Sequence, residues 1–109
     1  MDENMTLRAL AALSQKTRLD VFRLLVKAGP EGMLSGDIGD ALGVRQNTMS
    51  TNLSVLVNAG LITNERQGRT VRYFADFDAM RGLLSFLMAD CCNGRPEICD
   101  RVFEEIDCS

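Results

Sequence analysis

The chain has 109 residues, of which 46% are apolar and 25% charged, and its 12 basic and 15 acidic side chains give a net charge of −3. This length and composition indicate one ordered globular domain, whose small size limits the core and favours oligomerisation. The chain contains no histidine. That absence excludes Ser-His-Asp and Cys-His catalysis and every metal site that needs an imidazole ligand.

The ends of the chain bear on its compartment. Residues 1–4 are acidic and lead into no apolar segment, so we expect no secretory signal. No apolar run approaches the roughly 20 residues needed to span a bilayer, which predicts a cytoplasmic protein without a membrane partner. The four cysteines all lie in the last 19 residues, at Cys91, Cys92, Cys99 and Cys108. Thiols clustered in this way, in a reducing compartment, favour a ligand or redox site over a disulfide framework.

The first 60 residues have the spacing of apolar side chains that is typical of helices. Ser14 is a candidate N-cap for the second helix, and Gly29-Pro30 ends that helix. Gly43 supplies a tight turn between the third and fourth helices, which together predict a helix-turn-helix. The expected helices cover residues 5–13, the segment between Ser14 and Gly29, a short stretch from Ser35 to Leu42, and residues 46–59.

A β-hairpin is expected after Gly60, where the apolar period changes from 3.6 to 2 residues. Residues 61–66 and 70–74 are β-prone runs, and the turn residues Gln67-Gly68-Arg69 separate them. This segment directly follows the helix-turn-helix. The arrangement predicts a mainly α fold with a β-hairpin wing (α+β), a winged helix-turn-helix of about five helices and a two-stranded hairpin.

A further helix is expected after the hairpin, with Asp76 or Asp78 as its N-cap. It should end between Cys91 and Gly94, because Pro96 interrupts its continuation. The tail over residues 95–109 adds a short helical turn. The apolar side chains on one face of the long helix are expected to pack with the first helix across a dimer axis, and they are Met80, Leu83, Leu84 and Leu87.

The helix over residues 46–59 has two unlike faces. Met49, Leu53, Leu56 and Val57 form a stripe for burial. The other side chains are small or carry amides, where Lys and Glu would make a better solvated helix. Asn and Gln can pair with adenine, and Ser and Thr can reach bases or phosphates. The candidate DNA-binding residues of this helix are Gln46, Asn47, Thr48, Ser50, Thr51, Asn52 and Ser54.

The hairpin adds three candidate DNA-binding residues, Arg66, Arg69 and Arg72. A solvated hairpin tip would also tolerate arginines, but their position directly after a helix-turn-helix favours a wing that contacts phosphates or a minor groove. The charge is divided accordingly. Residues 1–74 carry 9 basic and 7 acidic groups, whereas residues 75–109 carry 3 basic and 8 acidic groups. The acidic total therefore does not argue against DNA as a partner.

Several stretches carry a family resemblance. They are ALSQKTRL at 12–19, IGDALG at 38–43, STNLSVLVNAGLI at 50–62, and Gly68-Arg69 in the hairpin. On these residues, the segment 7–89 resembles the ArsR/SmtB family of bacterial winged helix-turn-helix repressors. The resemblance implies a homodimer joined by its first and last helices, which occupies an operator in double-stranded DNA and leaves it when an inducer binds. It also implies a DNA-binding and dimerisation domain over residues 1–92, followed by a cysteine-containing tail over 93–109.

The chain departs from this family at the places where other members hold inducers. Asn52 stands where the family often has histidine. The Cys-x-Cys of many metal-sensing members is replaced by the segment Leu34–Asp37. The zinc site that other members build on the last helix needs histidine, which the chain lacks. A sensor, if present, is therefore expected in the cysteine tail.

The tail fits more than one sensor. Three thiolates from Cys91, Cys92 and Cys99 suit arsenic(III), and this inducer is implied by resemblance to arsenic-responsive members with a C-terminal Cys-Cys and a nearby third cysteine. Antimonite fits the same thiolates, and methylated arsenic(III) needs only two. Thiol oxidation or persulfide sensing is the main alternative. A zinc or cadmium site would take four cysteines, including Cys108. The cysteines could also be incidental residues of the tail.

An enzyme is not expected. A Cys-x5-Arg phosphate loop is absent, because the sixth residue after Cys91 is Glu97 and the sixth after Cys92 is Ile98. The chain also lacks a Cys-x-x-Cys pair, a Gly-rich nucleotide loop and a Walker lysine. The sequence thus predicts a DNA-binding repressor that carries no catalytic cofactor.

Overall fold

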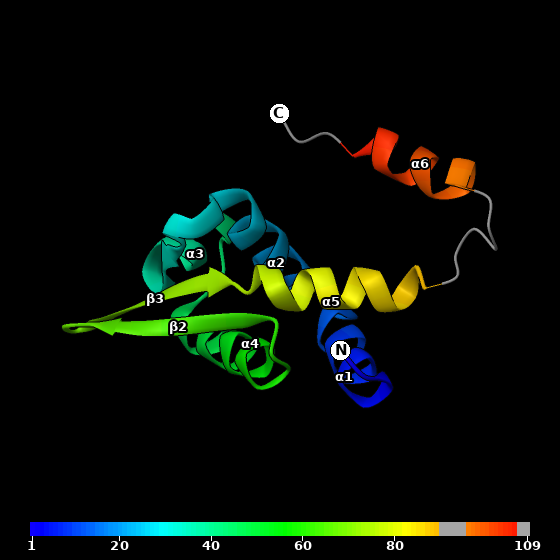
Figure 1. Cartoon of the computed structure of the whole chain (residues 1–109). Helices are drawn as coiled ribbons and strands as arrows, with labels where there is room; N and C mark the ends of the chain where they lie inside the picture. The colour runs from blue at the N-terminus through cyan, green and yellow to red at the C-terminus, as the bar shows by residue number, and fades with distance from the viewer. Residues whose placement is uncertain (90–95, 107–109) are drawn as a thin grey trace.

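Six α-helices and a three-stranded antiparallel sheet form the part of the chain that the computed structural model describes, which is residues 1–89 and 96–106 (Figure 1). This confirms the expected mainly α winged helix-turn-helix, with one more helix and one more strand than predicted. In chain order the elements are α1 (Glu3–Leu13), α2 (Lys16–Ala28), the 3₁₀ turn η1 (Gly29–Glu31), β1 (Met33–Leu34), α3 (Ser35–Leu42), α4 (Gln46–Asn58), β2 (Ile62–Gln67), β3 (Thr70–Ala75), α5 (Phe77–Leu87) and α6 (Pro96–Glu105).

The cap of α2 differs from the prediction. Ser14 closes the end of α1 instead, because its hydroxyl donates a hydrogen bond of 2.7 Å to the carbonyl of Ala11. Gln15 is the N-cap of α2, and its Oε1 accepts from the backbone N–H of Arg18 at 2.9 Å. A glutamine is a less common cap than serine, so local preference favoured the wrong residue. Asp76 caps α5, as one of the two predicted candidates.

The turn between α3 and α4 depends on glycine. Gly43 adopts a left-handed conformation with φ +66°, which other L-residues rarely adopt. One turn earlier, a Cβ on Gly39 would overlap the side chain of Gln46 and lie 3.0 Å from the carbonyl oxygen of Val44. The predicted helix-turn-helix is therefore confirmed. Its two helices approach each other closely at Gly39, where a larger residue would require the side chain of Gln46 to move.

The strand β1 was not predicted from the sequence. Its two residues pair antiparallel with β3, Met33 opposite Tyr73 and Leu34 opposite Arg72, which gives the strand order β1-β3-β2. A two-residue strand is too short to show an alternating pattern. Gly32 leads into it, where a Cβ would collide with the carbonyl oxygen of Tyr73.

The hairpin loop is shorter than predicted. Gln67 pairs with Thr70 across the β2–β3 ladder, so the connection contains only Gly68 and Arg69. Gly68 has φ +66°, as tight two-residue hairpin loops require. Figure 1 shows the β2–β3 hairpin extending away from the helices.

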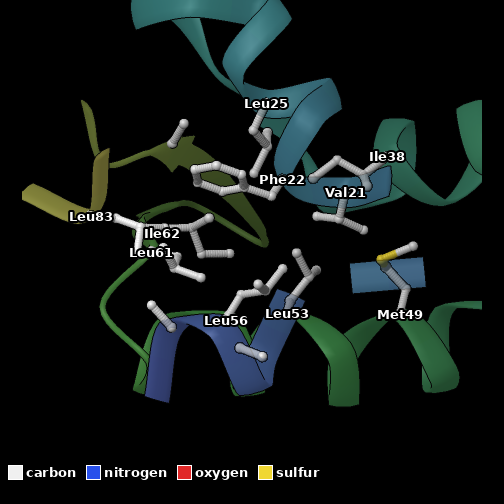
Figure 2. Packing of buried hydrophobic residues seen from close by; sticks show 13 residues of the cluster. Val21, Phe22, Leu25, Ile38, Met49, Leu53, Leu56, Leu61, Ile62 and Leu83 are labelled. Atoms are coloured by element: carbon white, nitrogen blue, oxygen red, sulfur yellow. The ribbon is translucent and has the colours of Figure 1, made fainter. Parts of the chain in front are cut away.

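The core lies between α2, α3, α4 and the base of the hairpin (Figure 2). Leu25 of α2 and Leu56 of α4 are fully buried, and Leu83 brings α5 onto the same cluster. The largest fully buried side chains are Leu25, Ile38, Met49, Leu53, Leu56, Leu61, Ile62 and Val21. This packing fixes the inner face of α4 and so determines which residues of α4 face outward.

The last two helices differ in extent from the prediction. α5 ends at Leu87, before the expected range of Cys91 to Gly94. α6 spans Pro96–Glu105, longer than the expected short turn. Proline suits the first helical position, where its missing N–H is not needed. The expected boundary between residues 92 and 93 lies outside the described residues. Within those residues, no helix is both long and apolar enough to cross a membrane.

We predict that Leu25→Ala lowers the free energy of unfolding by about 2–5 kcal/mol, because it removes a buried side chain and leaves a cavity. Leu19→Ala is the matched control, since Leu19 lies in the same helix but is 40% exposed. It should cost less than half as much. Urea unfolding followed by circular dichroism measures both, and equal losses would contradict the assignment of the core.

Candidate nucleic-acid interface

The outward side of α4 is polar and uncharged. The helix contains no acidic or basic residue over its whole length. Six of its seven candidate DNA-binding side chains are exposed, and they are Gln46, Asn47, Thr48, Ser50, Thr51 and Ser54. The inner stripe is confirmed for Met49, Leu53 and Leu56, which are buried, while Val57 is half-buried. The exposed side therefore presents amides and hydroxyls with no carboxylate to repel a phosphate.

Asn52 is the exception, and its expected place on the exposed face is wrong. Its side chain is 6% exposed, and its Oδ1 accepts from Nη1 of Arg18 at 3.4 Å. The reason is helical geometry: position 52 lies three residues after Met49 and four before Leu56, on the buried stripe. Its polarity had suggested the outer face.

Arg18 connects three helices. Its Nε donates to the carbonyl of Ala12, near the end of α1, at 2.7 Å. Its Nη1 reaches Asn52 in the middle of α4, and its backbone N–H is held by Gln15. Arg8 of α1 makes a separate contact with α4, donating from Nη2 to the carbonyl of Asn58 at 2.7 Å. These contacts fix α4 relative to α1. No local pattern predicts these contacts, because the partners in α4 are 34 and 50 residues away.

The three arginines of the wing have different surroundings. Arg66 and Arg69 are exposed, and among the described residues the one hydrogen bond of the Arg66 side chain runs from Nε to the carbonyl of Gly68, at 3.4 Å. Arg72 is half-buried and donates to Gln67 Oε1 and to the carbonyl of Glu31, each at 3.2 Å. Arg72 thus braces the hairpin against η1. Within the described part of the chain, Arg69 at the tip makes no hydrogen bond or ion pair.

Sequence reasoning missed one further cation beside α4. Arg45 is the N-cap residue of α4, and it is exposed. A basic residue directly before an uncharged polar helix was a signal that could have been used. The ion pairs of residues 1–89 and 96–106 are Lys16 with Asp20 and Arg81 with Asp78. Neither pair includes a residue of α4 or of the hairpin. The arginines of the hairpin are therefore not neutralised by an ion pair within the described residues.

The predicted cysteine site is not described by the structure. Cys91, Cys92 and Cys108 lie outside the described residues. Cys99 lies in α6, and its side chain is also outside the description. Among the residues that are described, no group of three or more His, Cys, Asp or Glu side chains could hold a metal ion.

The first and last helices of the winged domain expose apolar side chains. α1 packs on α5, and a Cβ on Gly82 of α5 would lie 3.2 Å from Cβ of Met1. Leu7 of α1 is 58% exposed, and Leu87 of α5 is 53% exposed. Of the four residues predicted to face a partner, Leu83 and Met80 pack within the protomer core, while Leu84 and Leu87 remain exposed.

Comparison with known proteins agrees with this arrangement. Residues 13–65 match the family model of a helix-turn-helix domain. The chain is 34% identical over 91 residues to YbzH of Bacillus subtilis, an uncharacterized HTH-type transcriptional regulator, covering 72% of this chain and 91% of YbzH. It is 32% identical over 81 residues to ArsR2 of Halobacterium salinarum, whose name refers to repression of an arsenical resistance operon. That match covers 74% of this chain and 66% of ArsR2, just under two thirds of its length.

A solved structure extends the comparison to three dimensions. The homodimeric winged helix-turn-helix DNA-binding domain of Mb0332 from Mycobacterium bovis superimposes with a TM-score of 0.65 at 29% identity. The match covers 80% of each chain. The likeness therefore includes the winged domain and not only the helix-turn-helix.

We predict that Arg18→Met lowers the free energy of unfolding by about 1–3 kcal/mol, because it leaves the carbonyl of Ala12 and Oδ1 of Asn52 without their donor. Arg23→Met is the control, since Arg23 is exposed on the same helix and should change stability by less than about 0.5 kcal/mol. Urea unfolding of the two variants decides the matter. If both behaved alike, the connecting role of Arg18 would be refuted.

Proposed function

Because the chain belongs to the ArsR family of winged helix-turn-helix transcriptional regulators, we propose that it is a transcriptional repressor that binds operator DNA as a homodimer. The observation that carries this proposal is the uncharged polar side of α4 beside a hairpin with two exposed arginines. Such a helix suits a major groove, where amides and hydroxyls meet base edges and phosphates. The hairpin then supplies positive charge to neighbouring phosphates or to a minor groove.

The dimer is proposed to form through α1 and α5. Exposed apolar side chains on both helices support this, because burying them needs a partner surface of the same kind. The solved structure of Mb0332 is of a homodimeric DNA-binding domain, which is consistent with the same assembly here. A two-fold dimer would place its two α4 helices in successive major grooves, roughly 34 Å apart on one face of the DNA. The operator is then a pseudo-palindrome.

The inducer is proposed to be trivalent arsenic, bound by thiolates of Cys91, Cys92 and Cys99. The support is chemical: arsenic(III) is a soft centre that accepts three sulfur ligands, and no histidine is available for another kind of site. The name of the relative ArsR2 refers to repression of an arsenical resistance operon, which supports arsenic as the inducer proposed here. These cysteines follow α5 in sequence, so ligation acts on the end of a proposed dimer helix. A shift of α5 changes the spacing of the two α4 helices and weakens operator binding.

We predict that Arg69→Ala weakens binding to every duplex tested, because a wing contact to phosphates does not read sequence. A homodimer loses two such contacts, so the slope of log K against log salt concentration should decrease by about 1.8. Fluorescence anisotropy with an operator selected from a random duplex library, and with an unrelated duplex, measures both effects. Arg23→Ala removes the same charge from α2 and serves as control. An unchanged slope in Arg69→Ala would exclude this role of the wing.

We predict that arsenite releases the operator under reducing conditions, and that Cys91→Ser, Cys92→Ser and Cys99→Ser each abolish release. Cys108→Ser is the matched control and should retain it. The same anisotropy assay is repeated with zinc, peroxide and a persulfide donor. Release by oxidant or persulfide alone would identify a redox sensor, and release by zinc that requires all four cysteines would identify a metal sensor.

The same proposal requires reciprocity. If arsenic weakens operator binding, the operator must weaken arsenic binding by the same factor. Titration of arsenite into the protein with and without saturating operator checks this equality. Equal arsenic affinity in the two titrations would show that the thiolates are not coupled to DNA.

A further inference from the structure

A polar hollow of about 460 Å³ opens beside α4, where α4 approaches the start of α2. Its lining consists of Gln15, Asn47, Thr48, Thr51 and Asn52, so it contains amide and hydroxyl groups and no carboxylate. Gln15 is the N-cap of α2, and Asn47 lies in the first turn of α4. The N-terminal turns of two long helices therefore border the same space, and both carry a partial positive charge there.

Gln15 presents a donor to this hollow. Its Oε1 accepts from the backbone N–H of Arg18 at 2.9 Å. A backbone N–H can only donate, so the oxygen of the amide must face it, and the NH₂ group must point the other way. Gln15 is one of the residues that line the hollow, and its NH₂ group is the donor that this contact leaves free.

Asn52 is oriented in the same way by a different donor. A guanidinium group has no acceptor, so Nη1 of Arg18, 3.4 Å away, fixes the Oδ1 side of the Asn52 amide. Its NH₂ group is thereby turned away from Arg18. Asn52 is 94% buried and is one of the residues that line the hollow. Within the described residues, its Nδ2 donates no hydrogen bond.

Asn47 completes a set of three. Its Oδ1 accepts from the backbone N–H of Thr48 at 2.8 Å, which leaves its NH₂ group for an outside acceptor. Thr51 donates its hydroxyl to the carbonyl of Asn47, at 3.3 Å. All three amides thus have their oxygens engaged by protein donors and their NH₂ groups available. A space bordered by several donors, two helix N-termini and no carboxylate selects an oxyanion.

We propose that this hollow binds one backbone phosphate of the operator, with the NH₂ groups of Gln15, Asn47 and Asn52 as donors. The inference rests on the proposed DNA-binding function and assigns a subsite within it. A base edge fits less well, because bidentate pairing with adenine uses the oxygen of an amide as well as its nitrogen, and these oxygens face the protein. The phosphate held here fixes how deeply α4 enters the groove. In this proposal Asn52 donates a hydrogen bond to the phosphate. Arg18 does not touch the DNA there but orients the amide of Asn52.

The test replaces each amide by its isosteric acid, in Gln15→Glu, Asn47→Asp and Asn52→Asp. Each variant keeps the oxygen that accepts from Arg18 or Thr48, so every hydrogen bond described above remains and only the NH₂ donor is lost. We expect the urea concentration at the unfolding midpoint of each variant to be no lower than that of the wild type. Affinity for the selected operator should fall about tenfold or more in each variant, because a hydrogen bond to a charged phosphate is lost and a negative charge added. Asn4→Asp, on the exposed start of α1, carries the same charge change as control.

Operators with a single methylphosphonate, which removes the charge of one phosphate, identify the contact. With the wild type, several positions in each half-site should lower affinity, those contacted by the wing included, and one of them should lose its effect in Asn52→Asp while the others keep theirs. A uniform response of all positions in both proteins would overturn the proposal. An NMR titration gives a second outcome that would overturn the proposal. If the side-chain NH₂ signals of the three amides shifted with inorganic phosphate but not with operator, the hollow would be a site for a free anion.

The two levels of the proposal fail differently. If the wild type binds the operator and all three acid variants bind it as well as Asn4→Asp, the phosphate subsite is wrong while the repressor function stands. If the wild type binds no duplex from the library, the repressor function is wrong and the subsite falls with it.

Discussion

The structure depends first on the burial of one stripe of α4. Met49, Leu53 and Leu56 enter the core shared by α2, α3 and β2, and each is at most 1% exposed. Full burial of such a side chain is worth about 1.5–3 kcal/mol. Turning the helix by one residue, about 100°, would expose all three. This constraint fixes the rotation of α4 about its axis. The side chains that are not buried, which are polar, then form its outer side. The buried apolar contacts of α4 therefore determine which of its polar side chains face outward, toward the proposed DNA site.

Arg18 adds a second constraint, of a polar kind. Its donors reach the end of α1, while Asn52 links it to the middle of α4. Arg8 supplies an independent connection from α1 to the last turn of α4. A charged group without acceptors can orient an amide unambiguously, which a hydroxyl could not do. The helix proposed to form the dimer and the helix proposed to read DNA are thus connected through the hydrogen bonds of Arg8 and Arg18.

The sequence predicted elements whose signals are local. Apolar periods predicted the helices and the hairpin, and Gly43 marked the turn of the helix-turn-helix. It did not predict β1, because two residues have no period, or the cap of α2, because local preference favours Ser14 over Gln15. Asn52 was misplaced since its polarity was given more weight than its angular position. The contacts of Arg8 and Arg18 depend on residues far along the chain, which no pattern within a single segment reveals.

The distribution of charge limits how an inducer can act. Residues 75–109 carry 8 acidic and 3 basic groups, whereas α4 carries none and the wing carries arginines. Phosphates of DNA repel acidic groups that lie within a Debye length, about 8 Å. This repulsion favours an orientation in which α4 and the wing, and not the acidic segment, face the DNA. The proposed inducer binds cysteines that follow α5 in this acidic segment of the sequence. Its effect would have to pass through α5 to α1, and from there through Arg8 and Arg18 to α4.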